Sequence, residues 1–178
     1  MGESGAAATP FAAWSLALLL AACSGASAPT APPCPTVLVL KGAERTADYS
    51  SGSTPRPEDL RYLAVLTDLV SACRYDEAGV DVGLRFSLIA ERGPAHGGGP
   101  LQLTYFVASL GPEQEILSKP LFDADIAFPE GAQRAGSSQE MTVHMPGVEP
   151  AVGAQYSVIL GFQLDDAEMH RRLDPENP

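Results

Sequence analysis

The chain of 178 residues predicts a mainly β domain, a single antiparallel β-sandwich. Beyond an apolar amino-terminal stretch, short alternating runs are separated by turns rich in Gly, Pro and Asp, a pattern typical of sandwiches and barrels. The clearest run is Val80–Ala90, where apolar residues alternate with small or polar ones and only Ile89 interrupts the polar face. Alternation of this length indicates a strand with one face in water.

Leu60–Arg74 fits either a helix or a strand, but it lacks helix-capping signals and a hairpin follows it. We therefore expect a strand that contains a bulge. Asp76–Gly79 is the expected turn of that hairpin, with Gly79 supplying a positive φ. Pro120 places its segment at a sheet edge, because proline cannot donate to the ladder. Further strands are expected at Thr36–Leu40, Leu101–Val107, Ile116–Phe128, Glu140–Met145 and Tyr156–Leu164.

The remaining segments predict loops and one short helix. Asp165 with Glu168 three residues later resembles a capping box, which predicts a helix at the carboxyl end. Arg171 and Arg172 lie at its favourable carboxyl-terminal end, and Pro175 stops it. Loops are expected at Lys41–Glu58, Gly93–Pro100, Glu130–Ser138 and Pro146–Gly153.

The amino terminus holds the most informative motif of the chain. The apolar run Phe11–Leu20 is shorter than the roughly 20 residues of a membrane-spanning helix and matches the roughly 7–15 of a signal peptide. It ends in Leu20-Ala21-Ala22-Cys23, which resembles the lipobox of bacterial lipoprotein precursors. That resemblance implies cleavage before Cys23, acylation of this cysteine and anchoring in a membrane. The alternative is a buried Ala/Leu helix with an accidental cysteine.

The lipoprotein interpretation divides the chain into three parts. Residues 1–22 are the signal peptide, residues 23–33 are the lipidated cysteine and a Pro/Ser/Ala tether, and residues 34–178 form the folded domain. The tether after Cys23 reaches at most ~33 Å when extended. Ser24 is not the aspartate that often retains such lipoproteins in the inner membrane. By this family analogy the outer membrane, facing the periplasm, is favoured.

Charge limits the classes of binding partner, and the cysteine count predicts a disulfide. The mature chain keeps 11 basic and 21 of the 22 acidic residues, a formal charge of −10, which repels nucleic acid and anionic bilayers. Membrane attachment must therefore come from the lipid on Cys23. Acylation leaves Cys34 and Cys73, an even pair in an oxidising compartment, and we expect a disulfide between them. Two buried free thiols are the alternative.

The sequence contains no complete catalytic or metal-binding motif, so we expect no cofactor and no metal site. His96-Gly97-Gly98-Gly99 matches the oxyanion loop of esterases, but the nucleophile elbow G-x-S-x-G does not occur. His96, His144 and His170 lack metal-ligand spacing. Asp123 and Asp125 share one face of a strand, which a solvated surface explains without Ca²⁺. A carboxylate pair that meets only in the folded chain stays open.

Two further resemblances concern the domain itself. Gly153–Val158 resembles the position where immunoglobulin-like domains place a corner tyrosine, here Tyr156. Several segments resemble small bacterial envelope lipoproteins of unassigned activity, which implies no functional residue. Those segments are Arg74–Glu77, Val80–Val82, Phe86, Glu91–Pro94, Tyr105–Val107 and Gly161–Leu164.

The sequence thus predicts a lipid-anchored envelope domain that binds or supports other envelope components. Its edge strands are the expected docking surface, because they can accept a strand from a protein partner. An envelope hydrolase with a carboxylate site and a passive structural component are the alternatives. A deep cleft with convergent acids would favour the hydrolase. An exposed apolar patch of several hundred Å² near an edge strand would favour binding. Neither the partner nor the oligomeric state follows from the sequence.

Overall fold

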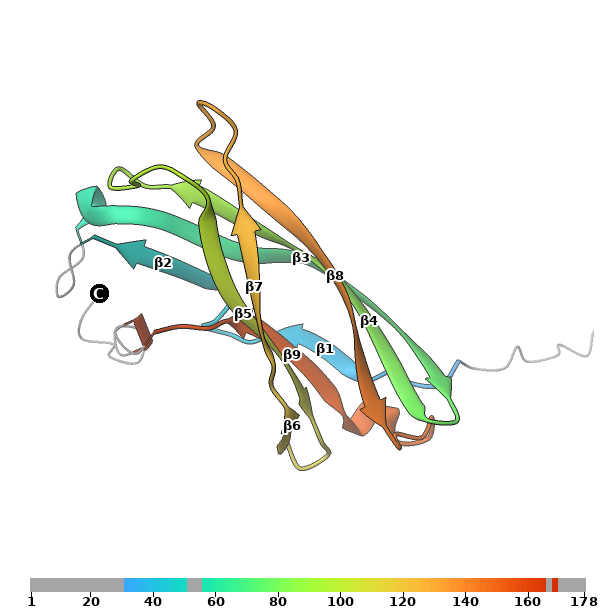
Figure 1. Ribbon diagram of the computed structural model, residues 1–178. Helices are drawn as coiled ribbons and strands as arrows, with labels where there is room; N and C mark the ends of the chain where they lie inside the picture. The colour runs from blue at the N-terminus through green and yellow to red at the C-terminus, as the bar shows by residue number, and fades with distance from the viewer. Residues whose placement is uncertain (1–30, 51–55, 166–167, 170–178) are drawn as a thin grey trace, which may run out of the picture. The chain divides into compact units, whose positions relative to one another are not determined.

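The computed structural model describes residues 31–50, 56–165 and 168–169. The described residues belong to one compact unit, which contains all the described strands. The unit is mainly β, as predicted, with its strands in two sheets (Figure 1). The predicted signal peptide, Cys23 and most of the tether lie outside the described residues, so these predictions stay open. Within the described part of the chain, no helix is both long and apolar enough to cross a membrane.

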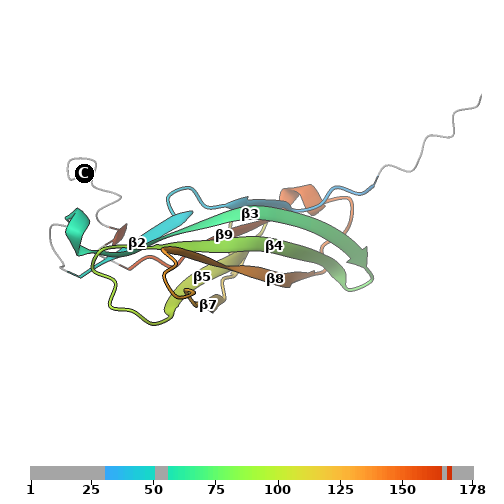
Figure 2. The same cartoon turned by 90° about the horizontal axis from the view of Figure 1, so that it is seen from above.

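The first sheet has four antiparallel strands in the order β2-β3-β4-β8, and Figure 2 shows β3, β4 and β8 following one another to the border of the sheet. Short β2 lies at one edge and long β8 at the other. The bounds are Arg45–Tyr49 for β2, Leu60–Asp76 for β3, Gly79–Arg92 for β4 and Arg134–Pro146 for β8.

The second sheet has the order β1-β9-β5-β6, and β7 also pairs with β5. The prediction of a purely antiparallel fold is wrong at one place, because β1 runs parallel to β9. Two single-turn 3-10 helices, Pro57–Asp59 and Gly153–Gln155, precede β3 and β9. The strands are β1 Thr36–Val39, β5 Leu101–Leu110, β6 Ile116–Ser118, β7 Leu121–Ile126 and β9 Ser157–Phe162.

One apolar core joins the two sheets. The alternation of β4 is confirmed, since its inward residues are at most 2% exposed and Ile89 lies on the outer face. Phe86 of β4 meets Tyr105 of β5 edge to face, with ring centroids 5.4 Å apart. Each buried side chain of this size stabilises the fold by about 1.5–3 kcal/mol relative to exposure. The inward β4 residues are Val80, Val82, Leu84, Phe86, Leu88 and Ala90.

The hairpin of β3 and β4 forms as the sequence predicts. The register of β3 shifts between Thr67 and Val70, where Asp68 adopts a φ of 55°, so the expected bulge is present. At the turn the Asp76 carboxylate accepts hydrogen bonds from the backbone N–H groups of Ala78 and Gly79. Gly79 has a φ of 147°, and a Cβ there would collide with the neighbouring β8 backbone.

Two segments predicted as loops are strands instead. β2 lies inside the expected loop Lys41–Glu58, and β8 begins at Arg134, inside the expected loop Glu130–Ser138. Both segments are polar, so propensity gives them no strand signal. Their pairing partners supply what the local sequence lacks. Gly136, for example, lies opposite Ile89 of β4, and a Cβ on this glycine would come within 2.6 Å of the Ile89 side chain.

One side of the domain is fastened by the predicted disulfide, which is confirmed: Cys34, just before β1, is bonded to Cys73 of β3, with a Cα–Cα distance of 5.7 Å. The Tyr75 hydroxyl adds a hydrogen bond to the carbonyl oxygen of Pro33. The sheets are therefore joined where the chain enters the domain. Tyr156 does not act as a corner tyrosine, because its hydroxyl makes no hydrogen bond within the described residues.

The carboxyl-terminal segment closes the free edge of β2. Asp165 accepts the backbone N–H of Glu168 at 2.6 Å, which confirms half of the capping box. The Glu168 side chain does not complete it, since its carboxylate binds the Thr46 hydroxyl at 2.8 Å and the Ala47 N–H at 3.0 Å. The rest of the predicted helix, with Arg171, Arg172 and Pro175, lies outside the described residues.

Candidate docking surface

The titratable residues named by the sequence lie far apart. His96 is in the loop between β4 and β5, whereas His144 is on β8 and contacts the Asp81 carboxylate at 2.8 Å. His170 lies outside the described residues. Asp123 of β7 accepts a hydrogen bond from the Thr104 hydroxyl at 2.6 Å, so a strand contact accounts for it. Among the described residues, no group of three His, Cys, Asp or Glu could hold a metal ion.

His96 borders a surface pocket of about 350 Å³ that Tyr62 also lines. Burial, followed by the negative charge of Asp48, raises the pKa of Tyr62 to about 12. Asp48 is 3.3 Å from the guanidinium of Arg61. The His96 ring stacks obliquely against Phe128, and within the described residues it makes no hydrogen bond to a serine or a carboxylate. A nucleophile needs a base within hydrogen-bond reach, and this pocket does not provide that pair.

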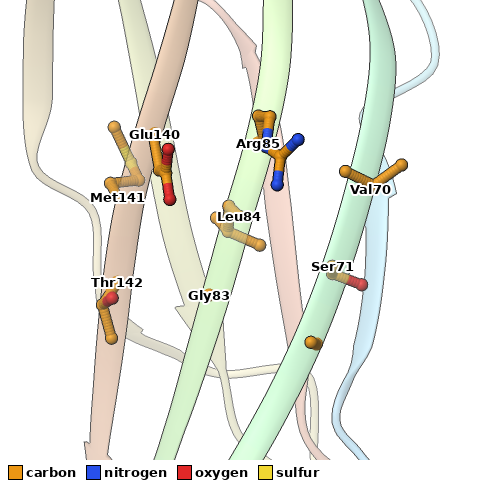
Figure 3. A pocket seen from close by; sticks show the side chains of 9 residues that line it. Val70, Ser71, Gly83, Leu84, Arg85, Glu140, Met141 and Thr142 are labelled. Carbon is orange, nitrogen blue, oxygen red and sulfur yellow. The ribbon is translucent and has the colours of Figure 1, made fainter.

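A second pocket is a shallow trough on the outer face of the β3-β4-β8 sheet (Figure 3). Gly83 forms its floor, because it has no side chain between Ala72 of β3 and Thr142 of β8. Arg85 and Glu140 stand level with each other on β4 and β8 at one end. The trough is open to solvent and offers charged side chains at its rim rather than an enclosed reaction site.

A further hollow, of about 590 Å³, lies on the outer face of the other sheet. Phe106 of β5 forms part of it, with the Lys119 ammonium 4.5 Å from the ring centroid. Leu164 and Met169 of the carboxyl-terminal segment also line it.

The open edge of β8 is the most distinctive surface of the domain. β8 has 13 residues, and in the described structure all its ladder pairing is with β4. Natural sheets usually protect such an edge with lysine, proline or a bulge. Before its last residue, Pro146, this strand has no lysine or proline, its exposed charged residues are Arg134 and Glu140, and its register with β4 is unbroken. It can accept an added strand.

Two hydrogen bonds show which backbone groups face outward. Arg92 of β4 donates to the Gln133 carbonyl, and Gly147 donates to the Ala78 carbonyl, so odd-numbered residues point their N–H and C=O groups at β4. In an antiparallel ladder this orientation alternates. The even-numbered residues from Arg134 to His144 therefore present their backbone groups at the free edge.

The second sheet also exposes apolar side chains. β7 lies near β8, and a cleft of about 250 Å³ opens between Phe122 of β7 and Met141 of β8. Three large side chains on β6 and β7 are exposed: Ile116 by 62%, Leu117 by 53% and Leu121 by 54%. We call Ile116, Leu117 and Leu121 the apolar rim. Leu121 lies opposite Phe106 and Ile116 lies opposite Leu110, so both belong to the outer face of the second sheet.

Behind the open edge, polar side chains form a short hydrogen-bonded chain. The Tyr105 hydroxyl donates to the Gln139 side chain at 3.3 Å, and Gln139 donates to the Ser137 hydroxyl at 2.8 Å. Burial raises the pKa of Tyr105, so this hydroxyl stays protonated at neutral pH. Sequence reasoning missed this half of the surface. The only signal was the small, polar run Gly136–Gln139, which is equally typical of a loop.

Comparisons with known proteins found no match. No protein-family model matches the chain, no curated protein is significantly similar in sequence, and no solved structure is significantly similar in fold.

Proposed function

We propose that this protein is a lipid-anchored lipoprotein of the cell envelope whose β domain binds other envelope proteins by accepting a strand at the open edge of β8. The observation that carries the proposal is the 13-residue strand β8, which has one unpaired side in the described structure. Backbone hydrogen bonds would supply affinity, and side-chain contacts along β8 would supply specificity. Among the described residues, His144 contacts the Asp81 carboxylate and His96 contacts the Phe128 ring, and neither is hydrogen-bonded to a serine or threonine, which supports binding over hydrolysis.

The anchor in this proposal is the lipid on Cys23, inferred from the lipobox resemblance. The acidic domain does not bind an anionic bilayer by charge, which leaves acylation as the means of attachment. We place the protein on the periplasmic face of the outer membrane because Ser24 follows the acylated cysteine. The finer architecture that we propose is an immunoglobulin-like sandwich with a short carboxyl-terminal helix; two sheets around one core and the Asp165 cap support it.

The anchor is tested by Cys23→Ser in the full chain. We expect the variant to lose its acyl mass and to leave the membrane fraction, whereas Ser24→Ala, the neighbouring control, keeps both. Unchanged fractionation with membranes and an unmodified amino terminus in the original protein would refute the anchor.

The docking edge is tested by Ser138→Pro. The Ser138 N–H points away from β4, so proline at this position leaves the β4–β8 ladder intact while it removes a donor from the open edge. Proximity labelling from the intact anchored protein should identify neighbours that Ser138→Pro loses and that Ser138→Ala retains. Equal labelling by all three proteins, with unfolding temperatures unchanged, would contradict docking at this edge.

A further inference from the structure

We propose that the strand added to β8 is β8 of a second copy of this chain, paired antiparallel about Ser137. The inference rests on the proposed function, because it names the partner of the same open edge. The two four-stranded sheets would join into one sheet across a two-fold axis. The argument depends on which backbone groups face outward and on where the charges of β8 lie.

The backbone restricts the possible registers. Hydrogen bonds across an antiparallel pair form between residues whose N–H and C=O groups both point at the partner. On β8 these are the even-numbered residues, so an even-numbered residue must lie opposite an even-numbered residue of the second copy. Every register that pairs an even residue with an odd one is excluded.

Charge selects among the registers that remain. Matching the whole strand about Glu140 places two glutamates directly opposite each other, which is destabilising. A register about Gln139 places Arg134 opposite His144, and one about Ser138 leaves Arg134 opposite Thr142 without an opposite charge. The register about Ser137 places Arg134 opposite Glu140, and the two-fold axis forms this pair twice.

The neighbouring strands extend this pattern. In the first copy Glu140 lies beside Arg85 of β4, and in the second copy Arg134 lies beside Glu91 of β4. The row across four strands therefore alternates Arg85, Glu140, Arg134 and Glu91. All four side chains are exposed, and in the described residues neither Arg134 nor Glu140 forms an ion pair. In the proposed dimer, Arg134 and Glu140 each gain an oppositely charged partner from the second copy.

The centre of the proposed pairing contains only small side chains. Gly136 of one copy lies opposite Ser138 of the other, and the two Ser137 residues meet at the axis. The outer row, Gly136 and Ser138, is exposed, so a second backbone can approach without displacing a large side chain. This part of β8 reads as a loop in sequence because it offers little to its own core, and its composition suits close contact between strands.

The test uses charge reversal in the full chain, with two differently tagged copies produced together and purified from membranes in detergent. Glu140→Arg or Arg134→Glu on both copies turns each attractive pair into a repulsive one. We expect the dissociation constant to rise about 10- to 100-fold for either variant with itself. A mixture of the two variants restores both pairs and should return to within about threefold of the original value.

Complementation separates pairing from a loss of stability. Each variant keeps its own repulsion toward β4 in the mixture, so recovery cannot come from refolding of the single chains. Recovery in the mixture alone supports the proposal. Dimers that tolerate both reversals, or variants that do not complement each other, would overturn it. A monomeric original protein at all attainable concentrations would also overturn it.

A cysteine at the axis gives a second measurement. Ser137→Cys should form a disulfide-linked dimer in the oxidising envelope, because the two residues lie opposite each other. Thr142→Cys is the matched control, since the two copies of this position are ~33 Å apart in the same register. Equal cross-linking at both positions, or none at Ser137→Cys, would refute the register.

The outcome also distinguishes the two proposals. If the charge and cysteine variants show no self-pairing but Ser138→Pro still loses its labelled neighbours, the partner is another protein and only the present inference fails. If Ser138→Pro changes neither dimer formation nor labelling, the docking function of β8 fails with it.

Discussion

Removing the Cys34–Cys73 bridge should cost this domain a large part of its stability. The perturbation is the double variant Cys34→Ser/Cys73→Ser, which leaves Cys23 in place. The bridge joins residues 39 positions apart, from the segment before β1 to β3 of the other sheet. Without it, the unfolded chain regains the freedom of a closed loop of this length.

The chain-entropy relation for such a loop gives a loss of about 4 kcal/mol in the free energy of unfolding. That is a substantial share of the roughly 5–15 kcal/mol that stabilises a typical domain. For a domain of this size, a loss of about 4 kcal/mol corresponds to a melting temperature about 8–16 °C lower. Tertiary contacts near Pro33 and Tyr75 would be lost in addition if the segment before β1 detached.

The assay is denaturant and thermal unfolding of the oxidised protein, the reduced protein and the double variant. Reduction should reproduce the effect of the variant and should not change the variant further. Ala72→Ser, an exposed neighbour on β3, is the control and should stay within about 0.5 kcal/mol of the original. A reduced protein within 1 kcal/mol of the oxidised one would refute the reasoning, as would two reactive thiols at Cys34 and Cys73 in material from the envelope.

Two further predictions concern the core and the response to pH. Phe86→Ala should lower the free energy of unfolding by about 3–5 kcal/mol, because the side chain is fully buried. Leu117→Ala, at an exposed position on β6, is the control and should change the free energy of unfolding by less than about 0.5 kcal/mol. Similar losses for both variants would contradict the assigned core. The pKa of Tyr62 is raised to about 12, so its contribution to stability is complete below pH 10 and disappears as the pH rises from 10 toward 12. Tyr62→Phe should flatten this dependence in unfolding titrations, and an unchanged slope would show that the phenol is not buried as described.

The parts of the fold that carry their own pattern were predictable from sequence. The alternation of β4 identified every inward residue from Val80 to Ala90, because each side chain there meets either core or water. The bulge in β3 and the turn before Gly79 followed from local signals as well. The cysteine pair followed from counting.

The missed segments depend on partners that lie far away in sequence. β2 contains Arg45, Thr46 and Asp48, and it becomes a strand because β3 pairs with it on one side and Glu168 binds it on the other. The first half of β8 becomes a strand because β4 extends beside it. The first half of the open edge was therefore invisible to periodicity, whereas the alternation of Glu140–Met145 predicted the second half.

The place of the Cys34–Cys73 bridge also decides how the domain bears a pull from its amino terminus. β1 has only four residues and one neighbour, so tension applied at its first residue would peel it from β9 bond by bond. Because the bridge precedes β1, it transmits the force to β3, whose 17 residues pair with β2 and β4. A force applied before Cys34 would therefore act on β3, which is paired on both sides, before it acts on β1.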